Sequence, residues 1–251
     1  MEKPPSSAVK SAAVLVIGDE ILSGRTQDTN TGTIARFLGL KGIDLKEARA
    51  VGDVQDEIVA ALNALRARYD FVFTTGGIGP THDDITADAV AAAFGVGIGY
   101  HPQAYALLEA RYGEGGFNAM RKRMARIPHG ATLIENRISG APGFRIGNVF
   151  VLAGVPAIAR AMLEALAPSL PEGPPVYAAA VTAGIAEGRV AEGLAAIQKA
   201  HPETLIGSYP FTTEDGGIGV QLVVRGRDGA AVTAAAAAIE AHLRALGVAA
   251  Q

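Results

Sequence analysis

Apolar runs alternate along the first half of the chain with segments in which apolar residues recur at helical spacing. Residues 11–17, 43–51 and 70–75 predict strands: the first is a continuous apolar run, and the third is rich in β-branched and aromatic residues. Residues 28–40 and 54–65 carry apolar side chains every three or four positions, which predicts helices. This alternation predicts an α/β fold, a three-layer and mainly parallel sheet covered by helices.

The pattern changes after the prolines of residues 168–175, which predict a linker. The elements predicted beyond it are strands at 176–182, 204–211 and 218–225, helices at 188–200 and 230–246, and a hairpin turn at 214–217. This β-α-β-β-α order predicts a second, smaller α+β domain with its helices on one face of the sheet. The expected organisation is a disordered lead-in over residues 1–10, an α/β domain over 11–170 and the α+β domain over 176–251.

Composition narrows the class of protein. A chain of 251 residues without cysteine has room for two domains, excludes disulfides and fits a cytoplasmic location. The net charge of −3 argues against nucleic acid as a partner, and the alanine-rich run 230–238 is too short to span a membrane. A local basic cluster, Arg121, Lys122, Arg123 and Arg126, is interpreted as a solvated helix face.

The most informative stretch follows the third predicted strand. Gly76, Gly77 and Gly79 stop that strand, Pro80 prevents it from resuming, and a helix is predicted over 87–94. A glycine-rich loop between a strand and a helix can turn backbone N–H groups inward, and the start of the helix adds partial positive charge. The stretch therefore predicts a site for a phosphate or another anion.

Acidic residues follow all three predicted strands of this domain. Asp83 and Asp84 lie in the glycine-rich loop itself, where they would repel an anion unless a cation stands between them. Hard oxygen ligands of this kind predict Mg²⁺ or a similar divalent ion. Asp19 and Glu20 follow the first strand and Asp53 follows the second, and the ends of parallel strands converge in space. Each of these aspartates could instead cap a helix.

Other polar residues near these loops have two interpretations each. Asn30 fits either a bond in the first helical turn or a ligand contact, and Thr75 could donate to a phosphate or belong only to the sheet. Residues 139–143 could form the opposite lip of a pocket or a plain tight turn. His82 could be a metal ligand or acid/base group, although an exposed loop histidine is the commoner case.

Several motifs together suggest a known family. They are IGDEILSG at 17–24, DTN at 28–30, VGD at 51–53, TGGIGPTHDDIT at 75–86 and APGF at 141–144. This set resembles the amino-terminal region of the competence/damage-inducible protein A (CinA) family, within the wider molybdopterin-binding superfamily. Residues 206–210 and the hairpin after them resemble the second domain of CinA-like proteins and a related domain of FAD synthases.

The resemblance implies a function and assigns roles. It implies a divalent-metal-dependent pyrophosphatase acting on an ADP-ribose-like or other diphosphate-linked nucleotide, with Asp53 and Asp84 catalytic. The alternatives are non-catalytic binding of molybdopterin or a nucleotide, and nucleotidyl transfer to a pterin phosphate in molybdenum cofactor biosynthesis. An enzyme is favoured over a carrier, and family analogy suggests a homo-oligomer, a dimer or trimer.

The complete predicted site draws on several loops. The phosphate- or nucleotide-binding residues are Thr75, Gly76, Gly77, Ile78, Gly79, Asn30, Ser139 and Gly140, and the metal ligands are Asp84, Asp83 and Asp53. The chain departs from the family pattern at Ser139-Gly140, where Gly-Thr is usual, and at residues 153–156, where Pro-Gly-x-Pro is usual. No stretch resembles the nicotinamide-nucleotide deamidase domain of CinA proteins, so deamidation is not expected.

Overall fold

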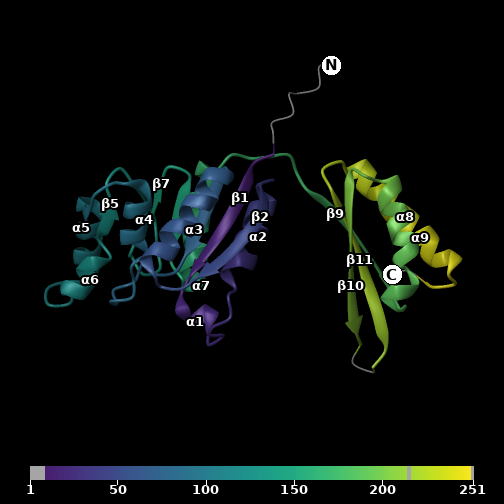
Figure 1. The fold of residues 1–251 in the computed structure, drawn as a ribbon, viewed down its shortest axis with the longest axis horizontal. Helices are drawn as coiled ribbons and strands as arrows, with labels where there is room; N and C mark the ends of the chain where they lie inside the picture. The colour runs from purple at the N-terminus through teal and green to yellow at the C-terminus, as the bar shows by residue number, and fades with distance from the viewer. Residues whose placement is uncertain (1–8, 214–215, 250–251) are drawn as a thin grey trace, which may run out of the picture. The chain divides into compact units, whose positions relative to one another are not determined.

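The computed structural model describes residues 9–213 and 216–249, and the chain divides into two compact units (Figure 1). Unit 1 ends at Gly173 and unit 2 begins at Pro174. The predicted lead-in falls mostly outside the described residues, as does part of the hairpin turn expected at 214–217. Among the described residues, no helix is long and apolar enough to cross a membrane.

Unit 1 is built on a six-stranded sheet with the order β2-β1-β3-β8-β7-β6. The strands are β1 (Ser11–Ile17), β2 (Asp44–Val51), β3 (Phe71–Thr75), β6 (Thr132–Ile134), β7 (Gly143–Ile146) and β8 (Val149–Leu152). The strands β2, β1, β3 and β8 are parallel, whereas β7 and β6 add an antiparallel edge. The predicted α/β class with a mainly parallel sheet is confirmed.

Helices connect and cover these strands. They are α1 (Asp19–Leu22), α2 (Asn30–Leu40), α3 (Gln55–Arg68), α4 (Thr86–Phe94), α5 (Pro102–Tyr112), α6 (Ala119–Arg123), α7 (Pro156–Leu166) and the 3₁₀ turn η1 (Ala167–Ser169). A separate two-stranded ladder, β4 (Ile98–Tyr100) with β5 (Arg126–Pro128), brackets α5 and α6. The short strands of this ladder are absent from the sequence-based prediction.

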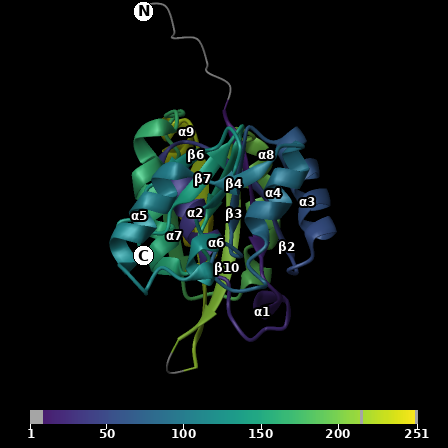
Figure 2. The ribbon, with the colours of Figure 1, turned by 90° about the vertical axis from the view of Figure 1, so that its left-hand side faces the viewer.

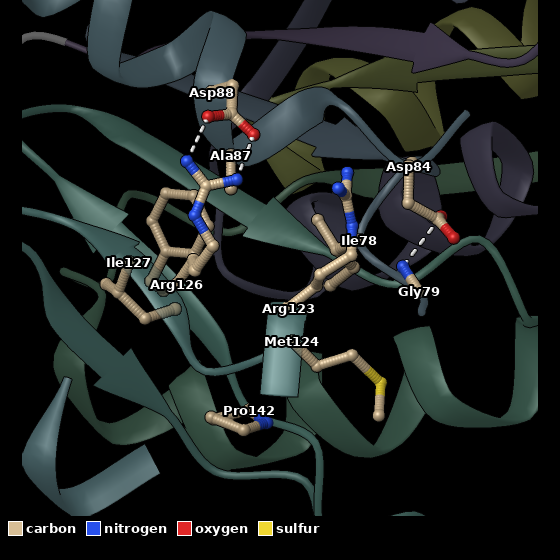
Figure 3. Close-up of a pocket in the computed structure, with 12 residues that line it drawn as sticks. Ile78, Gly79, Asp84, Ala87, Asp88, Arg123, Met124, Arg126, Ile127 and Pro142 are labelled. Carbon is tan, nitrogen blue, oxygen red and sulfur yellow. Dashed lines mark hydrogen bonds and ion pairs between the residues drawn. The ribbon is translucent and has the colours of Figure 1, made fainter. Parts of the chain in front are cut away.

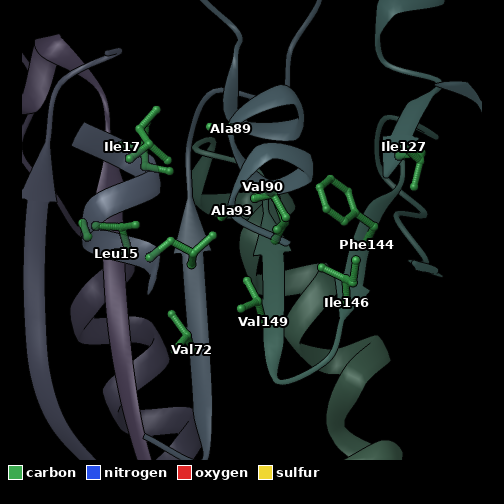
Figure 4. Close-up of a cluster of buried hydrophobic side chains, with 14 of the residues drawn as sticks. Leu15, Ile17, Val72, Ala89, Val90, Ala93, Ile127, Phe144, Ile146 and Val149 are labelled. Atoms are coloured by element: carbon green, nitrogen blue, oxygen red, sulfur yellow. The ribbon is translucent and has the colours of Figure 1, made fainter. Parts of the chain in front are cut away.

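Successive residues of β1 enter two different cores, which explains the three layers. Leu15 and Ile17 pack with Val90 of α4 on one face (Figure 4), in the same core as Ile58 of α3. Val14 and the other alternate residues of β1 pack on the opposite face with buried side chains of α2 and α7. Figure 2 shows α3 and α4 on one side of the strands and α2 and α7 on the other. A strand buried on both faces requires a continuous apolar run, as β1 has.

Unit 2 has the predicted β-α-β-β-α order. Its elements are β9 (Tyr177–Ala183), the 3₁₀ turn η2 (Glu187–Arg189), α8 (Ala191–Ala200), β10 (Thr204–Thr212), β11 (Ile218–Gly226) and α9 (Gly229–Ala245). The sheet is antiparallel, in the order β10-β11-β9. Leu222 and Val224 of β11 are fully buried together with Ile239 and Leu243 of α9. This confirms the smaller second domain.

Asp70 joins the starting ends of β1 and β3. Its carboxylate accepts hydrogen bonds from Lys10 Nζ (2.8 Å), from the Ser11 N–H (2.9 Å) and from the Ser11 hydroxyl (2.8 Å). The bond from the Lys10 ammonium, followed by the two bonds from Ser11, lowers the pKa of Asp70 from 3.8 to about 2. The pKa of Asp70 is lower in the folded than in the unfolded chain. The stabilisation is therefore fully present at pH values above the unfolded-state pKa of 3.8 and is lost as the pH falls through about 2.

We expect Asp70→Asn to lower the free energy of unfolding by about 1 kcal/mol at neutral pH, since the pair is partly exposed. The difference from the parent chain should shrink between about pH 4 and pH 2, which urea unfolding at several pH values can measure. Glu114→Gln, which removes an exposed carboxylate from a loop, is the control. A difference that does not change with pH would contradict the assignment.

Candidate functional site

A cleft of about 530 Å³ opens at the carboxyl ends of β1, β3 and β8. Its walls come from the loop after β3, the loop after β8, the turn before β7 and the segment that links α5 to β5. The lining residues are Glu20, Gly76–Pro80, Asp84, Tyr112, Arg121, Met124, Asn136, Ser139, Ala141, Ala153, Gly154, Val155 and Ile158. The volume lies in the range of small-molecule sites. The predicted loop edge is therefore a concave surface.

Glycine at position 76 lets three strand ends meet. Gly76 has φ +104°, and a Cβ there would overlap the carbonyl oxygen of Ile17 at the end of β1. A Cβ on Gly154, after β8, would lie 3.3 Å from the Gly76 Cα. The buried Thr86 closes the loop on the other side, since its hydroxyl donates to the Gly76 carbonyl (2.9 Å) and its N–H donates to the Gly77 carbonyl (3.0 Å).

The backbone N–H groups of this loop are partly used within the protein. The Gly76 N–H donates to a carbonyl of β8 (3.3 Å), and the Gly79 N–H donates to Asp84 Oδ1 (2.6 Å). Among the described residues, the N–H groups of Gly77 and Ile78 have no acceptor in the protein. The predicted anion site thus retains two backbone donors, and phosphate binding by them stays a prediction.

Asp84 holds its own loop together. Its carboxylate accepts hydrogen bonds from the N–H groups of Gly79 and Thr81 (2.6 and 2.7 Å) and from the Thr81 hydroxyl. The same carboxylate lies in the cleft lining. The residue predicted to be catalytic therefore sets the shape of the loop that borders the cleft, a role that its position in the motif did not reveal.

The acidic residues at three strand ends converge, as the parallel sheet predicts. Asp53 Oδ2 accepts from the Asp19 N–H (3.0 Å), and the Asp53 N–H donates to Asp19 Oδ1 (3.3 Å). Burial raises the pKa of Asp53, the bond from Asp19 opposes that shift, and the charges of Asp19, Glu20 and Asp83 raise it further. Of these residues, Glu20 lines the cleft.

The three predicted metal ligands do not form a preassembled metal site. Within residues 9–213 and 216–249, no group of three or more acidic or histidine side chains is placed so that it could hold a metal ion. Asp84 is bonded to its loop and Asp53 to Asp19, while Asp83 lies beside the exposed His82, with Oδ1 and Nδ1 3.8 Å apart. The described side chains therefore do not form a set of ligands for a bound Mg²⁺, and the requirement of the protein for Mg²⁺ stays a prediction.

The turn before β7 forms the opposite lip of the cleft. Asn136, which is buried, donates from Nδ2 to the Ser139 hydroxyl (2.6 Å) and the Ala141 carbonyl (2.8 Å). Its Oδ1 accepts from the N–H groups of Ile138 (3.0 Å) and Ser139 (3.2 Å). Ser139 lines the cleft, and Gly140 supplies a residue with φ +78° in the turn, while phosphate or nucleotide binding by these two residues stays a prediction. Asn136 was missed, although an Asn a few residues before a Ser-Gly pair fits a turn, because Asn side chains bond the backbone of the following residues.

Asn30 ties the start of α2 to the loop after β8. Its Nδ2 donates to the Gly154 carbonyl (2.7 Å), and its backbone N–H donates to Asp28 Oδ1 (2.9 Å). Its Oδ1 is buried and, within the described part of the chain, has no hydrogen-bond partner. Asn30 and the buried Thr75 line a small cavity of about 60 Å³ that shares Glu20, Gly76 and Gly154 with the cleft.

The basic cluster does not form a solvated helix face, so that interpretation is wrong. Arg121 lines the cleft, and Arg123 and Arg126 line an adjoining pocket behind the glycine-rich loop (Figure 3). The guanidinium of Arg126 pairs with both carboxylate oxygens of Asp88 (2.6 and 3.0 Å), while Lys122 lies over two aromatic rings. The physical reason is that α6 and β5 pack against this loop, which leaves these side chains half-buried.

The fold and the cleft define an α/β domain with its candidate site at the carboxyl ends of parallel strands, where such folds bind ligands. Residues 13–172 match the family model described as "Probable molybdopterin binding domain", and the chain belongs to this family. Residues 175–251 match the model described as "FAD synthase, middle domain". The CinA-like resemblance of unit 1 is confirmed by the relatives that follow.

The chain is 37% identical over 160 residues to a CinA-like protein of Syntrophotalea carbinolica, covering 61% of this chain and 38% of that protein. It is 33% identical over 216 residues to a protein of Aeropyrum pernix, covering 82% of this chain and 81% of that protein. The crystal structure of the protein CinA with unknown function from Thermoplasma acidophilum is similar with a TM-score of 0.61 and 35% identity, covering 64% of this chain and 98% of that one.

Gly77 and Gly95 provide a matched test of the close contact in the loop. Both have φ +65°, but a Cβ on Gly77 would overlap the Thr86 hydroxyl, whereas a Cβ on Gly95 would meet nothing within 4 Å. We expect Gly95→Ala to lower the free energy of unfolding by about 1 kcal/mol, the cost of a left-handed conformation, and Gly77→Ala by about 3 kcal/mol. Urea unfolding measures both, and equal losses would contradict the contact.

Proposed function

We propose that unit 1 binds an ADP-ribose-like or other diphosphate-linked nucleotide in the cleft and hydrolyses its diphosphate bond. The observation that carries the proposal is the glycine-rich loop at the end of β3, where the N–H groups of Gly77 and Ile78 have no acceptor among the described residues and border a cleft of about 530 Å³. Backbone donors in a glycine-rich loop between a strand and a helix suit phosphoryl oxygens.

Two family relationships support this ligand class. CinA-like proteins are among the relatives of unit 1, and unit 2 matches a domain of FAD synthases. FAD is itself a nucleotide joined through a diphosphate. By analogy between families, a chain that carries both domains fits a protein that handles diphosphate-linked nucleotides.

In the proposed reaction, a water oxygen forms a bond to phosphorus and the bond to the bridging oxygen breaks, so two monophosphates result. The N–H groups of Gly77 and Ile78 stabilise the charge that develops on the phosphoryl oxygens, and Asp84 keeps the loop in shape for them. The proton of the water passes to a carboxylate at this edge: Glu20 lines the cleft itself, and Asp53, whose pKa is raised by burial and by neighbouring charges, lies within electrostatic reach of Glu20.

Because the described residues contain no preformed metal-binding group, a requirement for Mg²⁺ is proposed to reside in the substrate, as a metal–diphosphate complex. The alternative function is binding of molybdopterin or a nucleotide without turnover. The description of the matched family as molybdopterin-binding favours that alternative, and nucleotidyl transfer to a pterin phosphate is its catalytic counterpart.

Turnover separates these functions. We expect the purified full chain to release AMP from ADP-ribose or from FAD in the presence of Mg²⁺, and to release much less in EDTA. Chromatographic detection of the monophosphate is the measurement. Binding of a nucleotide or pterin without release of monophosphate from any diphosphate-linked substrate would reject hydrolysis and favour the carrier.

Asp84→Asn tests the role of the loop in that reaction. We expect kcat to fall by about 100-fold, because the loop N–H groups lose their alignment, while the free energy of unfolding falls by about 1 kcal/mol. Asp83→Asn removes the same charge from the same loop without losing an acceptor for the Gly79 and Thr81 N–H groups, although Asp83 also interacts with the Thr81 side chain, and it should have a smaller effect on kcat. Similar losses in the two variants would mean that charge, and not loop geometry, is what matters.

A further inference from the structure

The electrostatics of the cleft require a positive group opposite the carboxylates. Glu20 and Asp84 both line the cleft, and a diphosphate would add further negative charge. Among the described residues that line it, Arg121 carries the only cationic side chain. Residues 9–213 and 216–249 contain no preformed metal-binding group that could take its place. A guanidinium in this position can offset the charge of an anionic ligand in a partly buried site.

Arg121 is held in place and still has donors to offer. Its guanidinium lies 4.3 Å from the centre of the Tyr112 ring, and Nη1 donates to the Gly116 carbonyl (2.6 Å). In the described part of the chain, no carboxylate forms an ion pair with it, and Nε and Nη2 make no hydrogen bond. Stacking and one hydrogen bond restrict the side chain, so less conformational entropy is lost when a ligand binds.

We infer that Arg121 and the N–H groups of Gly77 and Ile78 form a two-part diphosphate-binding site, in which the loop takes one phosphoryl group and Arg121 takes the other. Tyr112 is the positioning residue that supports the guanidinium. The inference rests on the ligand class of the proposed function and adds the residue that distinguishes a diphosphate from a monophosphate. Arginine suits this task because its planar fork can donate two hydrogen bonds to one phosphoryl group.

The neighbouring cations do not line the cleft. Arg126 is paired with Asp88. Arg123 lies beside Ile78 in the adjoining pocket and outside the cleft lining, and its buried Nε has no hydrogen-bond partner among the described residues (Figure 3). Lys122 lies 5.6 Å from the centres of the Tyr105 and Phe117 rings. These differences assign the second phosphoryl group to Arg121 and make Lys122 a suitable charge-matched control.

The test is calorimetric titration of the full chain, with Mg²⁺ present, using ADP, AMP and inorganic pyrophosphate as probes. We expect Arg121→Met to lower the affinity for ADP and for pyrophosphate at least tenfold. The affinity for AMP should fall less than about twofold. The affinity of Arg121→Lys for ADP should lie between those of the parent chain and of Arg121→Met, because lysine keeps the positive charge but lacks the planar guanidinium. Lys122→Met removes the same charge from the same helix and should leave all three affinities unchanged. Thermal unfolding checks that each variant is folded.

Several outcomes would overturn the inference. Unchanged ADP affinity in Arg121→Met would remove Arg121 from the site, and an equal loss for AMP would place it against the nucleoside or the phosphate that both ligands share. An equal loss of ADP and pyrophosphate affinity in Lys122→Met would indicate that the net charge of the protein, and not the position of Arg121, determines binding. Failure of the parent chain to bind ADP or pyrophosphate would reject both this site and the proposed ligand class. ADP binding that depends on Arg121, without turnover of ADP-ribose, would support the site and reject only the hydrolysis.

Discussion

The cleft depends on one close approach, in which the backbone after β3 meets the ends of β1 and β8 with no side chain between them. Gly76 lies against the Ile17 carbonyl on one side and against Gly154 on the other. The buried hydroxyl of Thr86 then fixes the Gly76 carbonyl. Any residue with a Cβ at position 76 would push these strand ends apart. Packing of the strand ends therefore requires glycine at position 76, independently of any ligand that the loop binds.

Much of the architecture of unit 1 follows from the periodicity of the sequence. The apolar run of β1 is buried on both faces because each set of alternate residues enters its own core, and this alone indicates a covered parallel sheet. The ladder of β4 and β5 escaped prediction because each strand has only three residues, too few to produce a periodic pattern. Without that ladder, the burial of the arginines around α6 could not be anticipated.

The candidate site was predictable in its position but not in its hydrogen bonds. Parallel strands bring Asp19, Asp53 and Asp83 to one edge, and their mutual influence on the pKa of Asp53 agrees with that convergence. Which carboxylate turns toward the cleft is decided by local donors: Asp84 is drawn to the N–H groups of its own loop, and Asp53 to Asp19. Such choices depend on three-dimensional geometry that spacing along the sequence does not contain.

Asn30 has a consequence for how the cleft can move. Its side-chain amide joins the beginning of α2 to Gly154, and Gly154 in turn lies against Gly76. Three loops that are distant in the sequence thus share one chain of direct contacts. Independent motion of any one of these loops would break the partly buried Asn30–Gly154 hydrogen bond or open a void between the glycines. We therefore expect the three loops to exchange their amide hydrogens as a single cooperative segment.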